Sequence, residues 1–363
     1  MAGLRQFLVL HEPEAACRER LTARGMPPVV AAEVAFYLAQ ATDFAGMVDE
    51  IGAALAGVGV ELVWAALDDH ARWLPPLLGP ARDTTLLWCL TDGFAWYRGS
   101  FASAAAALLD VAQFGSPPEL QLMAQDKFRT SAAASAFGLP VPATLLLEDG
   151  EILGRIVEPP AAGPWFVKPN TLGAKLGIGS DSRVPTVEAA LGPAARIRER
   201  YGDRALAQAY VAGRDVRVSC MDLGGEGPPP LGVYAVRTDG NEGFPTLEDS
   251  LRMTRLRAAG TGAGLAVALE DLGGTNEGRE VAELARRLAR GLGLRDYWSM
   301  DFRLDGAGRP WFLEFEVCPA VTIYDFLTYL RQAYGVGLGE ALARAAPVAF
   351  GRRRTVMGGF EVS

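Results

Sequence analysis

The segment YWSMDFRLDGAGRPWFLEFEV, residues 297–317, has the pattern of a β-hairpin. Two runs of strand-forming residues, 297–304 and 310–317, flank a turn of glycine and charged residues at 305–309. Side chains along a strand point alternately to the two faces of a sheet, so one face of this hairpin should be large and apolar. That face consists of Trp298, Met300, Phe302, Leu304, Trp311, Leu313, Phe315 and Val317.

The opposite face of the hairpin collects acidic residues. Asp301 lies there with Glu314 and Glu316, next to Phe312 and Arg303. Clustered carboxylates repel one another and resist desolvation, so they need a cation. Mg²⁺ or Mn²⁺, usually bound together with nucleotide phosphates, suits such oxygen ligands. On these residues alone the alternative is a solvated acidic face whose carboxylates pair with arginines.

Lysines are rare and clustered in this chain. Lys and Arg together number 35, and the three lysines, Lys127, Lys168 and Lys175, all fall within residues 127–175. Lys127 is expected in a helix, and Lys168 at the end of the apolar strand 165–167. A glycine-rich stretch follows, with Gly173 and Gly177, and glycine lets a backbone bring its N–H groups close to phosphates. Lysines, a glycine loop and a downstream acid cluster are the parts needed to hold ATP and a metal ion.

Composition excludes several functional classes. The net charge of −8 gives no basic footprint for nucleic acid. The apolar runs are far below the ~20 residues that a membrane-spanning helix needs. The four cysteines are widely spaced, which argues against a zinc site or a disulfide framework and favours the cytoplasm. We therefore expect small-molecule substrates, with no nucleic acid and no membrane partner.

Alternating strand and helix patterns in the first 118 residues predict a small parallel α/β domain. Strands are expected at 4–10, 58–66 and 84–90, and a helix over 33–55. The loop-like sequence FGSPP at 114–118 indicates a domain boundary. We expect units at 1–118, 119–212 and 213–363, the last carrying the metal site.

Five segments, in order, resemble the ATP-grasp superfamily, specifically D-alanine–D-alanine ligase-like enzymes. They are LTDGF at 90–94, QDKFRTSAAASAFGLPVP at 125–142, FVKPNTLGAKLGIG at 166–179, AQAYVAGRDVRV at 207–218 and MDFRLDGAGRPWFLEFEVCPAVT at 300–322. The resemblance implies an N-terminal parallel α/β domain followed by a two-lobed α+β ATP-grasp fold. It also implies an ATP-dependent carboxylate–amine ligase that forms an acyl phosphate and then an amide, often as a homodimer.

The resemblance assigns roles to matching residues. Lys127 and Lys168 match the lysines that contact the ATP phosphates. The loop from Gly173 to Gly179, which includes Gly177, matches the flexible loop over the phosphates. Gln208, with the backbone of Ala209 and Val211, matches an adenine-binding hinge, and Asp215 matches a ribose-binding acid. Asp301, Glu314 and Glu316 match the metal-binding triplet. Arg252 lies near the position of a cation that contacts the γ-phosphate, and Lys175 lies in the loop above.

The amino-acid pockets depart from the family pattern. The third metal-binding residue, normally Asn, is Glu316, and its extra charge predicts tight or dual metal binding. The arginine that helps hold the developing oxyanion is Ser299 here; Arg303 is the first candidate to replace it, with Arg237 and Arg255 as others. The early segment that holds the amine of the first D-alanine is absent, and only HEPE at 11–14 is seen. Asp92, Tyr97 and Arg98 are the residues expected to face the substrate.

These departures favour a relative that joins other amino acids, as in natural-product or peptide biosynthesis, over true D-alanine–D-alanine synthesis. One alternative keeps the ATP-grasp chemistry but ends in intramolecular cyclisation or in a phosphorylated product. A second alternative, from another class, is a nucleotide-binding module that has lost catalysis. The product of an incubation with ATP and amino acids would discriminate among the three.

Overall fold

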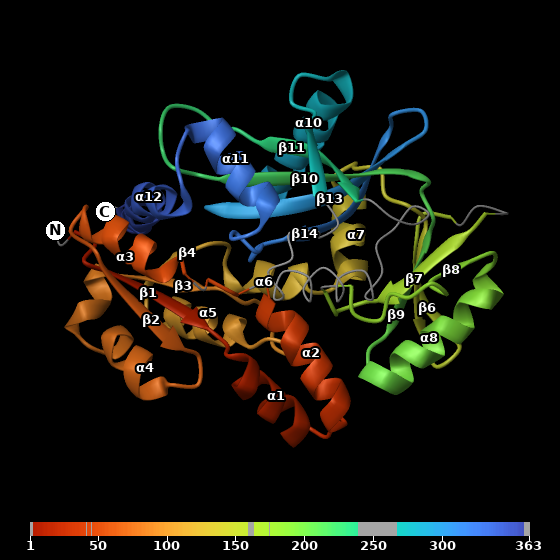
Figure 1. The fold of residues 1–363 in the computed structure, drawn as a ribbon, viewed down its shortest axis with the longest axis horizontal. Coiled ribbons are helices and arrows are strands. Elements are labelled where there is room, and N and C mark those ends of the chain that lie inside the picture. The colour runs from red at the N-terminus through yellow and green to blue at the C-terminus, as the bar shows by residue number, and fades with distance from the viewer. Residues whose placement is uncertain are drawn as a thin grey trace, which may run out of the picture.

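Three β-sheets organise the part of the chain that the structure describes (Figure 1). The computed structural model describes residues 3–40, 42–44, 46–158, 163–173, 175–238 and 267–358. Within these residues one sheet lies in each of the ranges 1–118, 119–212 and 213–363, the first parallel and the other two antiparallel. The predicted combination of a parallel α/β part with α+β lobes is confirmed. No helix in this described part is long and apolar enough to cross a membrane.

The N-terminal sheet has the strand order β2-β1-β3-β4, and all its neighbours are parallel. Its strands are β1 Gln6–His11, β2 Glu61–Ala66, β3 Thr85–Cys89 and β4 Ala112–Phe114. Its helices are α1 Glu14–Ala23, α2 Pro28–Gln40, α3 Val48–Ala56, α4 His70–Leu78, α5 Gly99–Leu108 and a 3₁₀ turn at Pro80–Thr84. The prediction of a single helix over residues 33–55 is wrong. The chain forms two helices there, and Gly46, at φ +79°, lies in the break between them.

The second sheet has the order β6-β5-β9-β7-β8 and is antiparallel throughout. Its strands are β5 Thr144–Glu148, β6 Glu151–Ile156, β7 Trp165–Pro169, β8 Arg183–Val184 and β9 Ala205–Ala209. Helix α8, Val187–Tyr201, buries Ala190, Ala194 and Ile197 against this sheet. Helices α6, Pro118–Ala124, and α7, Lys127–Ala136, lead into it. Asp126 caps α7 by accepting a hydrogen bond from the Arg129 amide, which fixes Lys127 as the first helical residue.

The third sheet has the order β12-β11-β10-β13-β14. Its strands are β10 Gly213–Met221, β11 Gly232–Thr238, β12 Val267–Asp271, β13 Tyr297–Asp305 and β14 Pro310–Glu316. Helix α10, Asn276–Leu292, packs its apolar stripe of Val281, Ala285 and Leu288 against the apolar face of this sheet. Helices α11, Tyr324–Tyr334, and α12, Leu338–Gly358, follow β14.

The predicted hairpin is confirmed as β13 and β14, with one correction. The pairing register shifts by one residue, because Asp301 pairs with Glu314 whereas the next residue, Phe302, pairs with Phe312. Leu313 is therefore the extra residue of a β-bulge. The bulge moves Phe312 from the acidic face, where strict alternation placed it, into the apolar core beside Phe302 and Phe315. Leu313 lies instead on the side of the carboxylates.

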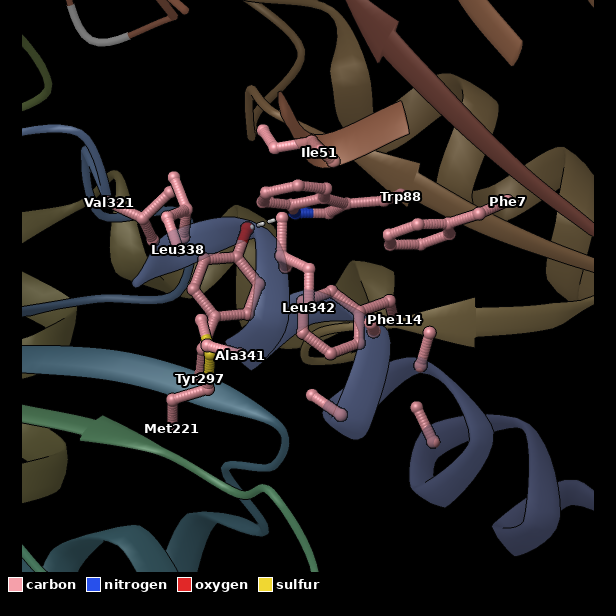
Figure 2. Packing of buried hydrophobic residues seen from close by; sticks show 14 of the residues in the cluster. Phe7, Ile51, Trp88, Phe114, Met221, Tyr297, Val321, Leu338, Ala341 and Leu342 are labelled. Carbon is pink, nitrogen blue, oxygen red and sulfur yellow. Dashed lines mark hydrogen bonds between the residues drawn. The ribbon is translucent and has the colours of Figure 1, made fainter. Parts of the chain in front are cut away.

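The largest hydrophobic core joins the two ends of the chain. It contains residues of β1, β3 and β4 together with Tyr297 of β13 and residues of α11 and α12. Figure 2 shows Trp88 and Tyr297 at its centre, with the Trp88 indole donating to the Tyr297 hydroxyl at 2.7 Å. Since this core spans the N-terminal sheet and the third sheet, it fixes the acidic hairpin relative to the N-terminal sheet.

Candidate functional site

A cavity between the second and third sheets brings together residues from seven parts of the chain. It is lined by Lys127, Phe166, Lys168, Pro169, Leu172, Gly173, Lys175, Ile178, Gln208, Ala209, Tyr210, Val211, Asp215, Arg303, Leu313 and Glu314. Most of the residues predicted to bind ATP are therefore found in one place. Asp301 and Glu316 are not in this lining but lie on the same hairpin, beside Glu314.

Lys127 ties α7 to both the glycine-rich loop and the acidic hairpin. Its ammonium donates to the Leu172 carbonyl at 2.7 Å and lies 3.6 Å from Oε2 of Glu314. Its backbone amide donates to the carbonyl of Asn170 at 3.0 Å. The lysine is only 7% exposed, so its charge is held at the wall of the cavity.

Lys168 is on β7, next to the strand's last residue, and is also 7% exposed. Burial lowers the pKa of its ammonium below the usual value, and nearby carboxylates, Glu314 foremost, offset part of that effect. The two lysines thus flank Glu314 on the cavity side. An anionic ligand here would meet two ammonium groups that water reaches poorly.

The glycine-rich loop contributes unevenly to the cavity. At Gly173 a Cβ would meet nothing within 4 Å, so the backbone is open to a ligand there. Gly177, at φ +72°, is not in the lining; a Cβ there would lie 2.6 Å from the Pro169 ring, so this glycine serves close packing. Lys175 lines the cavity with a left-handed backbone at φ +61°, a conformation uncommon for a residue with a side chain.

The end of β9 forms another wall. The side chain of Gln208 is used within the sheet, where its Nε2 donates to Oγ1 of Thr144 at 3.1 Å. The amides of Ala209 and Tyr210 donate to the carbonyls of Ala143 and Pro164, both at 2.8 Å. These two residues therefore have only carbonyl oxygens and side chains left to offer a ligand. Sequence reasoning missed Tyr210, whose ring lies beneath the Arg183 guanidinium, 4.5 Å from its centre.

Asp215 and Arg303 form an ion pair at one end of the cavity. They lie opposite each other on β10 and β13, and Arg303 Nη1 is 2.8 Å from Asp215 Oδ1. Arg303 also donates to the Gly213 carbonyl at 2.8 Å. This geometry directs the Arg303 guanidinium toward Asp215 and the Gly213 carbonyl.

The cation beside the acidic hairpin is Arg217, which sequence reasoning missed. It lies on β10 opposite Asp301. Its guanidinium is 3.3 Å from Asp301 Oδ1, 2.5 Å from Glu316 Oε2 and 2.7 Å from Oδ2 of the fully buried Asp325. It also donates to Ser299 Oγ at 3.1 Å. The available signal was a single arginine within the apolar run VRVSCM of a strand.

The charged groups of this cluster shift one another's pKa values. Burial raises the pKa of Asp301 above its usual value, and Arg217 offsets part of that rise. The pKa of Glu314 is lowered although burial acts in the opposite direction, because Lys127, Lys168 and Arg217 surround it. The pKa of Arg217 is raised well above its usual value by Glu316 and the other carboxylates, against the effect of burial. The arginine therefore stays charged.

The fit of a divalent metal ion can be judged from these donors. Asp301 and Glu314 face each other across β13 and β14 and offer the hard oxygen ligands that Mg²⁺ prefers. Glu316 is turned to Arg217 and to Ser299 Oγ, which lies 3.0 Å from Glu316 Oε2. In the described ranges no three His, Cys, Asp or Glu side chains gather as a metal site. Two of the three predicted ligands thus fit a metal ion.

The predicted substrate residues lie outside the lining of this cavity. Asp92 accepts a hydrogen bond from Gln125 Nε2 at 3.0 Å, and burial, with a further contribution from Glu316, raises its pKa to about 7. The Tyr97 hydroxyl donates to the Leu38 carbonyl. Arg98 Nε lies 3.6 Å from Glu12 Oε1.

Glu12, within the segment HEPE, is a further residue of this region. Its side chain is 1% exposed, and Arg20 donates to both of its oxygens, at 2.7 and 2.9 Å. Among the other candidates, Arg252 and Arg255 lie outside the described residues, as does the side chain of Arg237.

The amino-acid sequence is similar to those of curated D-alanine–D-alanine ligases. No protein-family model matches it. It is 26% identical over 236 residues to a D-alanine–D-alanine ligase of Bordetella petrii, covering 65% of this chain and 67% of that protein. It is 30% identical over 241 residues to a D-alanine–D-alanine ligase of Chromohalobacter salexigens, covering 66% of this chain and 70% of that protein.

Solved structures share the fold over nearly the whole chain. A D-alanine–D-alanine ligase of Bacillus anthracis, complexed with ATP, superposes with a TM-score of 0.64 at 14% identity, covering 97% of this chain and 99% of that one. The VanG D-Ala:D-Ser ligase of Enterococcus faecalis superposes with a TM-score of 0.60 at 10% identity, covering 95% and 99%. At these identities the likeness concerns the fold alone.

Proposed function

Since the chain belongs to the D-alanine–D-alanine ligase family of ATP-grasp proteins, we propose that it is an ATP-dependent ligase joining an amino-acid-type carboxylate to an amine. The observation that carries this proposal is the convergence of Lys127, Lys168 and Glu314 at one cavity wall. Buried ammonium groups suit polyphosphate, and the flanking carboxylates suit the divalent cation that accompanies it.

The proposed binding mode follows the order of residues along the cavity. The adenine is assigned to the wall formed by Gln208, Ala209 and Val211, and the ribose to Asp215, which Arg303 orients at 2.8 Å. The phosphates are assigned to Lys127, Lys168 and the loop from Gly173 to Lys175. Asp301 and Glu314 would hold Mg²⁺ or Mn²⁺, which supplies further positive charge at the phosphates when bound.

The proposed reaction has two steps. An oxygen of the substrate carboxylate attacks the γ-phosphorus, the bond between the γ-phosphorus and the β–γ bridging oxygen breaks, and ADP leaves. The amine nitrogen then attacks the carbonyl carbon of the acyl phosphate, loses a proton and displaces phosphate, which leaves an amide. Arg217 and the two lysines provide fixed positive charge near these anions. An acyl phosphate is labile in water, so a closed site favours amide formation over hydrolysis.

The substrates are proposed to differ from a pair of D-alanines, as in natural-product or peptide biosynthesis. Glu12, in the segment HEPE where the family's amine-binding segment is missing, has both oxygens occupied by Arg20 and has Arg98 close by. A carboxylate neutralised in this way is a poor partner for a substrate ammonium.

The protein is proposed to act in the cytoplasm, because its four free thiols fit a reducing environment. We also propose that the protein is a homodimer. Light scattering of the full chain would measure its molar mass in solution.

The direct experiment incubates the protein with ATP, Mg²⁺ and a panel of D- and L-amino acids, and follows phosphate release and product mass. The proposal expects ADP, phosphate and a product equal to two substrates minus water. A product equal to one substrate minus water would indicate cyclisation, and a phosphorylated product would indicate a kinase. ATP binding without turnover on any substrate would indicate a nucleotide-binding module.

A further inference from the structure

Arg217 holds three carboxylates with three different nitrogens. Nη1 contacts Asp301, Nη2 contacts Glu316 and Nε contacts Asp325, all within 3.3 Å. The arginine side chain is 16% exposed and that of Asp325 is 0% exposed. A planar guanidinium with several fixed donors suits such bridging, and it does not lose its proton in proteins. Arg217 is therefore a permanent cation inside the acidic cluster.

Protein charges already balance most of this cluster. Asp301, Glu314, Glu316 and Asp325 supply four negative charges, whereas Arg217, Lys127 and Lys168 supply three positive ones. Without Arg217, the three carboxylates of the acidic hairpin beside a polyphosphate would demand more positive charge from bound cations. With Arg217 present, that demand falls, and Glu316 already has its counterion at 2.5 Å.

The residue at position 299 makes room for this cation. Ser299 pairs with Glu316 across the hairpin, and its Oγ lies 3.1 Å from Arg217 Nη2 and 3.0 Å from Glu316 Oε2. A long side chain at this position would occupy the space of the guanidinium. The small side chain of Ser299 on β13 thus leaves the space that the Arg217 guanidinium on β10 occupies.

We propose that Arg217 takes the place of a second divalent cation, so that the chain binds one metal ion with the nucleotide, held by Asp301 and Glu314 and not by Glu316. This inference rests on the proposed ATP-dependent function. It replaces the sequence-based expectation that the extra charge of Glu316 leads to dual metal binding. Asp301 and Glu314 face each other in register and are held less closely than Glu316. The Asp301 oxygens lie 3.3 and 3.4 Å from Arg217 Nη1 and Glu314 Oε2 lies 3.6 Å from Lys127 Nζ, whereas Glu316 Oε2 lies 2.5 Å from Arg217 Nη2.

The first test counts metal ions. The full chain is titrated with Mn²⁺ in the presence of a non-hydrolysable ATP analogue, and free Mn²⁺ is measured by its electron paramagnetic resonance signal. The inference expects one bound Mn²⁺ per chain. Two per chain would overturn the inference while leaving the proposed function standing. If no Mn²⁺ binds in a nucleotide-dependent manner, both are overturned.

Two variants test which residues are responsible. Arg217→Met should allow a second Mn²⁺ to bind, and Mn²⁺ alone should raise its melting temperature more than that of the parent protein. Glu316→Gln should leave Mn²⁺ affinity within about threefold, because Glu316 is not a ligand; a loss greater than about tenfold would overturn the inference. The matched control is Arg20→Met, which removes another buried arginine–glutamate pair, outside the cavity, and should keep one Mn²⁺. If Arg217→Met does not fold, the parent count and Glu316→Gln still decide.

Discussion

Arg217 on β10 and Asp301 on β13 lie directly opposite each other in the sheet, with Nη1 3.3 Å from Oδ1. The pairing places a permanent cation in the middle of an acidic hairpin, on the strand adjacent to it. It also links that hairpin to α11, because the same guanidinium contacts the buried Asp325 near the start of that helix. The acidic cluster is thus part of the fold's stability as well as of the candidate site.

The first prediction concerns that stability. Replacing Arg217 with Met removes the counterion of three carboxylates, and breaking a buried ion pair costs about 3–5 kcal/mol. Urea unfolding of the Arg217→Met variant should show a loss of this size. Adding Asp325→Asn should recover part of it, since the fully buried carboxylate is then gone. Equal stability of the single and double variants would contradict the assigned coupling.

The second prediction concerns the two phosphate lysines. Arg carries the same charge as Lys, but its wide planar group does not fit where Lys127 Nζ reaches the Leu172 carbonyl at 2.7 Å. Lys127→Arg and Lys168→Arg should each lower kcat/KM for ATP by about 100-fold or more, the range found when one preorganised donor is lost. Arg129→Lys, on the exposed side of the same helix, is the matched control and should change little. Wild-type rates in both lysine variants would refute their assignment.

The third prediction concerns pH. The pKa of Asp92 in the folded protein is raised to about 7 by burial, so the folded state binds a proton that the unfolded chain releases near its ordinary pKa of 3.8. Stability contributed by this group therefore falls as pH rises from about 4 to about 7. Asp92→Asn keeps an acceptor for Gln125 but has no carboxylate to ionise. The unfolding free energy of this variant minus that of the wild type should therefore be larger at pH 8 than at pH 5. A difference in unfolding free energy that does not depend on pH would contradict the raised pKa.

The fourth prediction concerns substrate binding. Nε of Arg98 is buried and, within the described structure, makes no hydrogen bond, lying 3.6 Å from Glu12. This donor is proposed to meet a substrate carboxylate. Arg98→Met should then raise KM for the amino-acid substrate by about tenfold, the loss of roughly one charge-assisted hydrogen bond, with a smaller effect on kcat. An unchanged KM, together with a lowered melting temperature, would assign Arg98 to structure alone.

Much of the fold could be predicted from local patterns, and particular residues show where this stops. Period-two alternation predicts the hairpin of β13 and β14 and the closeness of Asp301 and Glu314. The same rule misplaces Phe312, because a bulge at Leu313 inserts one residue and reverses the alternation. A continuous helical pattern likewise conceals the break between α2 and α3 near Gly46.

The candidate site shows the same division. Lys127, Lys168 and Asp215 lie in contiguous motifs, so their resemblance to a family places them in one cavity. Sequence reasoning does not find Arg217 and Asp325, because strand β10 and helix α11 bring them to the acidic hairpin from distant parts of the chain. Sequence reasoning sought a replacement for the arginine missing at the position of Ser299, first at Arg303 on the same strand and then at Arg237 or Arg255. The structure places Arg217 there from the neighbouring strand.

In the proposed reaction a carboxylate is activated by phosphorylation and captured by an amine. The most direct measurement uses amino acids labelled with ¹⁸O in the carboxylate, incubated with ATP and Mg²⁺, and analyses the released phosphate and the product by mass spectrometry. We expect one ¹⁸O transferred to phosphate for each amide formed, together with ADP. Phosphate released without ¹⁸O while an amide accumulates, or no turnover of any carboxylate despite ATP binding, would contradict the proposed reaction.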